Sequence, residues 1–248
     1  MQGLLFWMAF GVLLPQALWT RQATPRFRAP SGETHGLITP AHTGDNSEPL
    51  EFVGLGDSII AGVGAKTMTE TLVVQAARAL SGHLNRPIQW RALGKIGANG
   101  EQIEARAHQM DWPQSADVVL ISTGVNDLLG LVTVGTWQKR VQRLVETVRD
   151  KAPNAWIVFC GLPPMQIFPA LPWPLSHVLG FRARQLDLAL VQATAPFERV
   201  LSIKIYDQVS RTFMAADGFH PGPKGYQVFG ALVADALSAK WHSISRIL

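Results

Sequence analysis

Residues 54–62 read GLGDSIIAG and place Ser58 just after the short apolar run LEFV. A serine hydroxyl is a poor nucleophile until a neighbouring base takes its proton. Ser58 therefore has two possible roles: it caps a helix, or it is held at a strand end because it attacks a substrate. The tripeptide GDS does not decide between them, so the answer depends on what else the chain brings to the same place.

A base and a carboxylate occur together in the loop DGFHPGPKGY, residues 217–226. Asp217 and His220 lie three residues apart in a turn rich in glycine and proline. A carboxylate beside a histidine selects the tautomer of the ring and stabilises its imidazolium form. Taken alone, the loop is explained more simply if Asp217 caps the last helix and His220 lies at the surface.

Acyl transfer also needs hydrogen-bond donors aimed at the developing oxyanion. Asn126, in the stretch TGVNDL, offers a side-chain amide, and Gly97, in GKIGANG, lets a backbone N–H approach a ligand closely. Each residue also has a simpler explanation, because Asn126 can cap a helix and Gly97 can serve a turn. If every simple explanation held, all these residues would meet at one edge of the fold by coincidence.

The elements that would position these residues alternate between strand and helix from residue 50 onward. The amphipathic spacing of 136–149 and 224–240 predicts helices. Apolar runs predict strands at residues 51–55, 88–93, 117–122, 155–160 and 199–205. Near-continuous apolar strands of this kind form parallel sheets covered on both faces. Such sheets bind ligands at the carboxyl ends of their strands, where the polar stretches fall.

The motifs GDSI, a glycine after the second strand, GVND and DGFH resemble those of the SGNH hydrolases, or GDSL esterases/lipases, in order and spacing. The resemblance covers about residues 51–240. It implies a flavodoxin-like three-layer α/β sandwich with a five-stranded parallel sheet. It also implies Ser58 as nucleophile, His220 as base and Asp217 as the group that orients it. The Gly97 N–H, the Asn126 side chain and the Ser58 N–H would form the oxyanion hole.

The sequence departs from the family pattern in two places. The usual leucine after the serine is Ile59, which leaves the chemistry unaffected. The turn after the second strand reads GANG where many members carry a threonine, so Gly97 is chosen over Gly94 and Gly100 for the oxyanion hole.

The bulk composition fits a single folded domain and excludes several function classes. Hydrophobic residues make up 47% and charged residues 16% of the 248, with one cysteine, Cys160, and a net charge of +4. No basic stripe interleaved with aromatics occurs in the body, so we expect no nucleic-acid partner. No Cys/His cluster has metal-ligand spacing, and no glycine pattern fits a phosphate or dinucleotide loop. We therefore expect neither a metal nor a cofactor.

The first 49 residues differ from the rest. Residues 1–21 form a hydrophobic segment without acidic residues, near the lower length limit for a membrane span, and arginines follow at 21, 26 and 28. We expect an uncleaved membrane anchor or interfacial helix, with a cleaved export signal as the alternative. Residues 22–49, rich in Pro, Gly, Thr and Ser, are expected to be a linker, and 50–248 the hydrolase domain.

The stretch GLPPMQIFPALPWPLSH, residues 161–177, follows the fourth predicted strand and should border the site. An apolar loop beside a serine nucleophile suits an acyl chain, although these side chains would equally cover a sheet edge. We therefore predict a serine esterase acting on short- to medium-chain acyl esters or lipids. The alternatives are a lysophospholipase, a thioesterase or a carbohydrate deacetylase on the same scaffold, and a noncatalytic lipid-binding module.

Overall fold

The computed structural model describes residues 2–25, 27–40, 48–113, 115–205 and 208–245. In these residues a six-stranded sheet has the order β1-β3-β2-β4-β5-β6. The strands are β1 His35–Ile38, β2 Leu50–Gly56, β3 Ile88–Gly94, β4 Val118–Ser122, β5 Trp156–Cys160 and β6 Val200–Ile203. Strands β2 to β6 pair in parallel. Their order is that of flavodoxin-like sheets, which confirms the predicted fold class.

The sheet has one strand more than the five expected, because part of the predicted linker forms β1. His35–Ile38 pairs antiparallel with β3, from His35 opposite Arg91 to Ile38 opposite Ile88. The run HGLI is short and weakly patterned, so its local sequence gives little strand signal. It becomes a strand because the free edge of β3 offers backbone hydrogen-bond partners.

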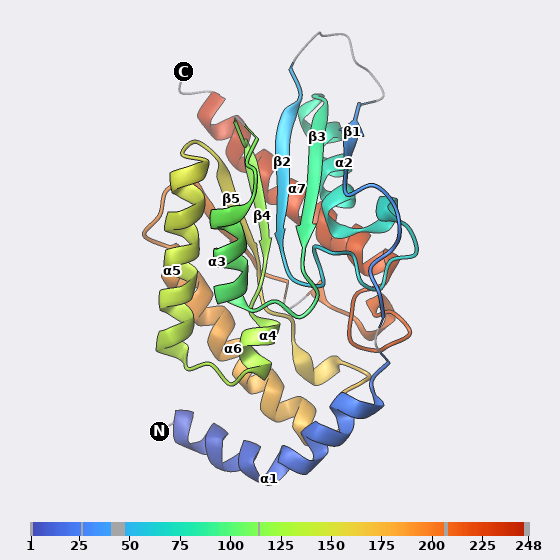
Figure 1. The fold of residues 1–248 in the computed structure, drawn as a ribbon, viewed down its shortest axis with the longest axis vertical. Helices are drawn as coiled ribbons and strands as arrows, with labels where there is room; N and C mark the ends of the chain where they lie inside the picture. Colours follow the sequence, from blue (N-terminus) through green and yellow to red (C-terminus); the bar gives the residue numbers. More distant parts are fainter. Residues whose placement is uncertain (1, 26, 41–47, 114, 206–207, 246–248) are drawn as a thin grey trace.

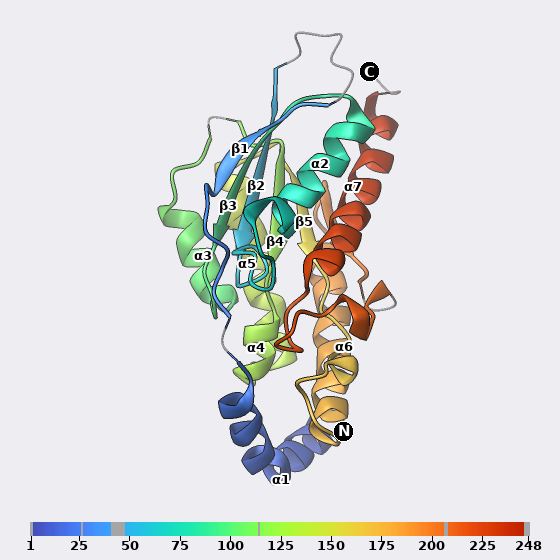
Figure 2. The same ribbon diagram turned by 90° about the vertical axis from the view of Figure 1, so that its right-hand side faces the viewer.

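Helices cover both faces of the sheet (Figures 1 and 2). On one face lie α2 Leu72–Leu84 and α7 Pro223–Ser245, which pack against each other. On the other face lie α3 Gly100–Gln109, α5 Val134–Lys151 and α6 Leu175–Thr194, while the short α4 Val125–Leu129 follows β4. Short 3-10 turns occur at η1 Met68–Glu70, η2 Met165–Ile167 and η4 Arg211–Phe213. Each face of the sheet thus has its own hydrophobic cluster.

Helix α5 shows how the local sequence builds one of these layers. The Thr133 hydroxyl accepts a hydrogen bond from the Thr136 N–H at 3.2 Å and so caps the first turn. The apolar stripe expected over 136–149 is buried, and the Trp137 indole N–H donates to the Leu186 carbonyl at 2.9 Å. Burial of one large side chain of such a stripe contributes about 1.5–3 kcal/mol. The stripe therefore packs α5 against this face of the sheet, in contact with α3 and α6.

The N-terminal segment forms α1, Gln2–Ala23, which contains Pro15. The helix lies at the end of the molecule toward which the parallel strands point (Figure 1). It packs on α6, and the Gln16 side chain donates to the Trp173 carbonyl at 3.0 Å. Leu13 and Ala17 contact the cluster beneath it. None of the helices in the described part of the chain is long and apolar enough to cross a membrane.

Candidate active site

Ser58 lies in a tight turn immediately after β2 and not at the start of a helix. The Val63 N–H donates to the Ser58 carbonyl at 3.0 Å, and the Ala61 N–H donates to the Asp57 carbonyl at 3.1 Å. The next α-helix, α2, begins only at Leu72 and has Thr71 as its N-cap. The question raised by GDSII is thereby answered: Ser58 is not a helix cap.

The loop before α7 brings a histidine and a carboxylate to Ser58. The His220 Nε2 atom lies 3.0 Å from Ser58 Oγ, and His220 Nδ1 lies 2.7 Å from Asp217 Oδ2. Asp217 is six residues before the first residue of α7, Pro223, so it does not cap that helix. The serine, the imidazole and the carboxylate form a continuous hydrogen-bonded chain across 162 residues of sequence separation.

Backbone and side-chain hydrogen bonds prepare Asp217 to carry a negative charge. Its Oδ1 accepts the N–H groups of Phe219 at 2.9 Å and His220 at 3.0 Å, while Oδ2 faces the ring. Burial acts to raise the pKa of this carboxyl, but the bonds from His220 and Phe219 outweigh burial and lower the pKa below its usual value. Asp217 is therefore ionised at neutral pH and can stabilise a positive charge on the His220 ring.

The residues expected to form an oxyanion hole surround the same space. Ser58, Gly97 and Asn126 line one cavity. Gly97 has a φ of +78°, where glycine is strongly favoured. In the described residues, neither the Ser58 N–H nor the Gly97 N–H donates a turn or loop hydrogen bond to a backbone carbonyl. Of the other candidate glycines, Gly94 packs on the Ala61 backbone.

Asn126 is held in place by a hydrogen bond to Ala98, on the loop after β3. Its Nδ2 donates one hydrogen bond to the Ala98 carbonyl at 2.9 Å, which leaves the second hydrogen of this amide for another acceptor. The N-cap of α4 is Gly124, and Asn126 lies inside the helix, so the capping explanation for this residue is excluded. β2 and β4 are adjacent strands at the point where the strand order reverses, where open α/β sheets bind ligands.

Asp57 braces the turn that carries Ser58. Its Oδ1 accepts the Ile59 N–H and the Ser122 hydroxyl, each at 3.0 Å. Burial raises its pKa to about 6, although these two bonds act against the rise. Asp57 thus ties the end of β2 to the end of β4, on either side of the reversal in strand order.

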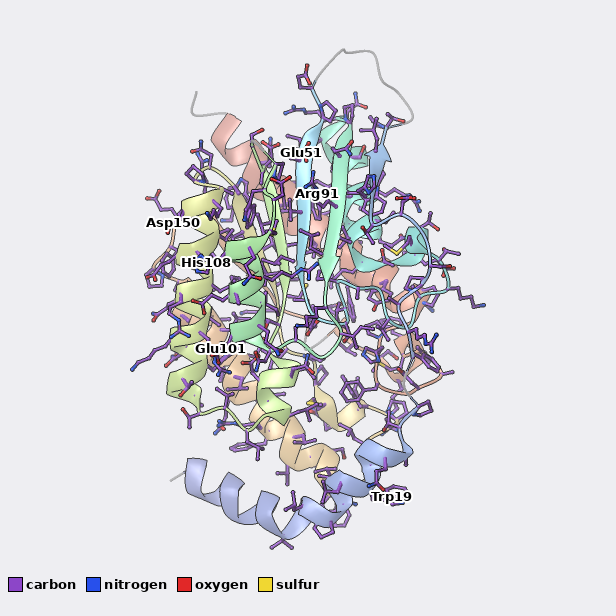
Figure 3. All side chains as sticks on the ribbon, viewed as in Figure 1. Trp19, Glu51, Arg91, Glu101, His108 and Asp150 are labelled. Atoms are coloured by element: carbon purple, nitrogen blue, oxygen red, sulfur yellow. The ribbon has the colours of Figure 1, made fainter. Side chains whose placement is uncertain are left out.

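A second buried carboxylate braces the loops that carry Gly97 and Asn126. Asp127 is fully buried; it accepts the Gly100 N–H at 2.8 Å and pairs with Arg140 Nη1 at 2.8 Å. Arg140 also reaches Glu101 at 2.7 Å. Figure 3 labels Glu101 near the N-terminal end of α3, on the side of α5. The network joins α3, α4 and α5 behind the site.

The cavity beside Ser58 has a volume of about 210 Å³. From the apolar loop 161–177, Phe168 lines it, whereas Met165 and Leu171 are buried in the core and Trp173 is 74% exposed. The two explanations of this loop, an acyl-binding wall and a cover for the sheet, therefore apply to different residues of it.

The cavity also has lining residues that the sequence analysis did not identify as part of a site. Phe229 and Val233 on α7, and Ile203 at the end of β6, lie along its wall. The apolar stripe of α7 predicts their burial, but a stripe facing a cavity and a stripe facing solid core have the same periodicity. No signal in the sequence distinguishes the two.

The arrangement has the parts that acyl transfer requires. The Ser58 hydroxyl lies within hydrogen-bond reach of the His220 ring, which the Asp217 carboxylate orients. The residues whose N–H groups could serve as donors, Gly97 and Asn126, line the adjoining cavity with Ser58. Such a constellation can attack a carbonyl carbon and stabilise the charge that develops on its oxygen.

Comparison with known proteins gives the same assignment. The GDSL-like lipase/acylhydrolase family matches residues 55–228. The spore germination lipase LipC of Bacillus licheniformis is 22% identical over 200 residues, covering 72% of this chain and 92% of that protein.

Solved structures share the fold. The lipase/acylhydrolase from Enterococcus faecalis superposes with a TM-score of 0.61 at 21% identity, covering 77% of this chain and 96% of its own. The family 3 carbohydrate esterase of Clostridium thermocellum superposes with a TM-score of 0.60 at 18% identity, covering 77% and 100%. The match to the family spans most of the hydrolase domain and includes all the motifs that the sequence analysis singled out. The chain therefore belongs to the GDSL-like lipase/acylhydrolase family, the SGNH hydrolases, and is a carboxylic ester hydrolase.

Proposed function

We propose that this enzyme hydrolyses esters of short- to medium-chain carboxylic acids through an acyl intermediate on Ser58. The observation that carries the proposal is the hydrogen-bonded chain from Ser58 through His220 to Asp217, with contacts of 3.0 and 2.7 Å. The base is within reach of the proton that it must remove.

In the proposed reaction, Ser58 Oγ attacks the ester carbonyl carbon while His220 Nε2 takes the hydroxyl proton. The carbonyl oxygen becomes an oxyanion that accepts hydrogen bonds from the Ser58 and Gly97 N–H groups and the Asn126 amide. The carbon–oxygen bond to the alcohol then breaks, and His220 returns its proton to the leaving alkoxide. Water, activated by His220, hydrolyses the acyl-serine and restores the hydroxyl. Asp217 stays ionised throughout.

The nature of the cavity supports an apolar acyl group as the substrate. Beyond the polar groups beside Ser58, its walls are aliphatic and aromatic, with Ile59, Val125, Phe168 and Phe219 among them. Sugar hydroxyls need several fixed polar partners, which these walls do not supply. A lysophospholipase or thioesterase differs from a simple esterase in the leaving group, and assays with both classes of substrate separate them.

The test measures hydrolysis of p-nitrophenyl esters of graded chain length by wild type and by Ser58→Ala. We expect the substitution to reduce kcat by about 10³-fold or more, because the covalent route is lost. Ser202→Ala is the matched control, since the Ser202 hydroxyl bonds to Thr194 and does not line the cavity. A fluorophosphonate should label Ser58 in wild type and in the control. Equal rates for wild type and Ser58→Ala would refute the proposal, and so would labelling of a different serine.

We also propose that the N-terminal segment associates the enzyme with a membrane surface. The support is the side of α1 that faces away from α6, which carries large apolar side chains in the exposed positions Val12, Leu14, Leu18 and Trp19. Figure 3 labels Trp19 there, at the end toward which the strands point. Trp173, also exposed, lies in the apolar loop 161–177, and its carbonyl accepts the hydrogen bond from Gln16 of α1. Helices hydrophobic on every side are rarely left in water, and a lipid surface would cover this one.

A further inference from the structure

The cavity beside Ser58 has two ends of different character. At one end Ile96, 53% exposed, and the exposed Gly97 form an open mouth. At the other end the walls are buried residues from the far side of the sheet, in α2, β6 and α7. They are Leu72, Ile203, Ile205, Phe229 and Val233.

The two ends also belong to different hydrophobic clusters. Phe168, which also lines the cavity, is a member of the cluster under α3, α5 and α6. All the inner wall residues belong to the cluster between the sheet and helices α2 and α7. The cavity therefore runs from the carboxyl edge of the sheet into the α2–α7 layer. An apolar ligand bound at this inner end would be shielded from solvent.

Polar groups occupy only the Ser58 part of this space. Polar residues line that part, whereas the buried walls toward α7 present aliphatic and aromatic carbon. The polar residues are Asp57, Ser58, Ser122, Thr123, Asn126 and His220. A ligand with one polar end at Ser58 and an apolar tail matches this distribution, because burying the tail removes its apolar surface from water.

We propose that the inner end of the cavity is the acyl-chain site, and that α7 and β6 set the length of chain accepted. This inference rests on the proposed esterase function and adds to it the placement of the acyl chain. The alcohol must leave while the acyl group remains bonded to Ser58, so the alcohol has to face the open mouth. The buried inner end then suits the acyl part.

The cavity volume gives the expected length. A cavity of about 150 Å³ holds one benzene molecule, six carbons, so a cavity of 210 Å³ holds on the order of eight non-hydrogen atoms, the ester carbonyl beside Ser58 included. Chains of about six to eight carbons would fill the site. Longer chains would have to protrude from it or displace Phe229 and Val233 from the core.

The experiment compares kcat/KM for p-nitrophenyl acetate, hexanoate, octanoate and laurate. Val233→Phe narrows the inner end and should lower the octanoate-to-acetate ratio about tenfold or more, whereas Phe229→Ala should shift the preference toward laurate. Val228→Phe is the matched control, because Val228 lies on the same helix, is half-buried and does not line the cavity. This control should leave the ratio as in wild type.

Ratios separate the inference from simple loss of folded protein, which lowers the rates for all chain lengths together. A second series, acetates of alcohols of increasing length, tests which half of the ester enters the cavity. If both variants hydrolysed the esters with the same octanoate-to-acetate and laurate-to-acetate ratios as wild type, the inference would be wrong and the esterase function would be unaffected. An effect confined to the alcohol series would also overturn the inference. Absence of hydrolysis and of fluorophosphonate labelling in wild type would instead refute the proposed function.

Discussion

At the scale of single residues, two buried aspartates show how surroundings decide charge. Asp217 accepts hydrogen bonds from Phe219 and His220, and its pKa is lowered. Asp57 accepts two bonds as well, yet burial dominates and raises its pKa to about 6. Asp217 therefore adds stability above its unfolded pKa of about 3.9, and this is lost as the pH falls through the folded value. Asp57, whose folded pKa is raised, adds stability at low pH, and this stability is lost as the pH rises through the folded value.

Asp57 should make the enzyme less stable as the pH rises from about 4 to 6. Its folded pKa lies above the unfolded one, so the folded state holds a proton that the unfolded state has released. The difference corresponds to about 3 kcal/mol of unfolding free energy. Asp57→Asn keeps the oxygen acceptor but cannot ionise. Urea unfolding at pH 4 and pH 7.5 should show the variant gaining about this amount relative to wild type at the higher pH.

The control for this prediction is Asp150→Asn, a change at an exposed aspartate on α5 (Figure 3). It should leave the pH dependence of unfolding as in wild type. If the Asp57 variant and wild type lose or gain stability in parallel between the two pH values, the assigned role of Asp57 is wrong.

At the scale of elements, the site depends on loops that helices hold from behind. Gly97 precedes α3, and Asn126 lies in α4. The hydrogen bonds of Asp127 hold these two helices together without involving Ser58. The Asp127–Arg140 pair and the Gly100 N–H join these helices to α5. The donors of the oxyanion hole are thus positioned by residues outside the cavity.

Removal of Arg140 should destabilise the whole domain. Arg140→Ala leaves the Asp127 carboxylate, fully buried, without its cation. Breaking one side of a buried pair costs about 3–5 kcal/mol. Glu101→Gln, the control, removes only the outer partner of Arg140, which is 65% exposed, and should cost less than about 1 kcal/mol. Urea unfolding measures both. Similar losses for the two variants would contradict this account of the network.

At the scale of the whole molecule, the site and α1 occupy the same end. The parallel strands point toward this end, and α1 lies across it beneath α4 and α6 (Figures 1 and 2). An enzyme resting on a lipid surface through α1 would thus have the carboxyl edge of its sheet on the membrane side. This arrangement suits a substrate that partitions into lipid.

Replacing Leu18 and Trp19 together by glutamate should weaken binding to phospholipid vesicles. Both side chains face outward from α1, and charges on that face oppose contact with the acyl region. Flotation with vesicles of mixed neutral and anionic lipid measures the effect, which we expect to be tenfold or more in the bound-to-free ratio, about 1.4 kcal/mol. Leu188→Glu, at an exposed apolar site on α6, is the control and should bind as wild type. Equal losses of vesicle binding in both variants would contradict the proposal. Recovery of exported protein from which α1 has been cleaved would also contradict it.

The sequence by itself determined the parallel α/β sheet, because the period of apolar residues is a local property that chain geometry converts directly into strands and helices. The motifs also singled out Ser58, Gly97, Asn126, Asp217 and His220, since they fall in the polar stretches expected at the carboxyl ends of parallel strands. Taken one by one, these residues were explained more simply by structural roles, because capping and catalysis use the same residue types.

Only the tertiary structure decided what depends on contacts between distant segments. Strand β1 forms because β3 leaves an edge free. The local β-strand preference of HGLI is too weak to predict this strand from the sequence. The stripe of α7 predicts that Phe229 and Val233 are buried, but whether they meet solid core or a cavity depends on shape complementarity with β6 and α2. Packing of that kind is summed over many distant side chains, and no local pattern encodes it.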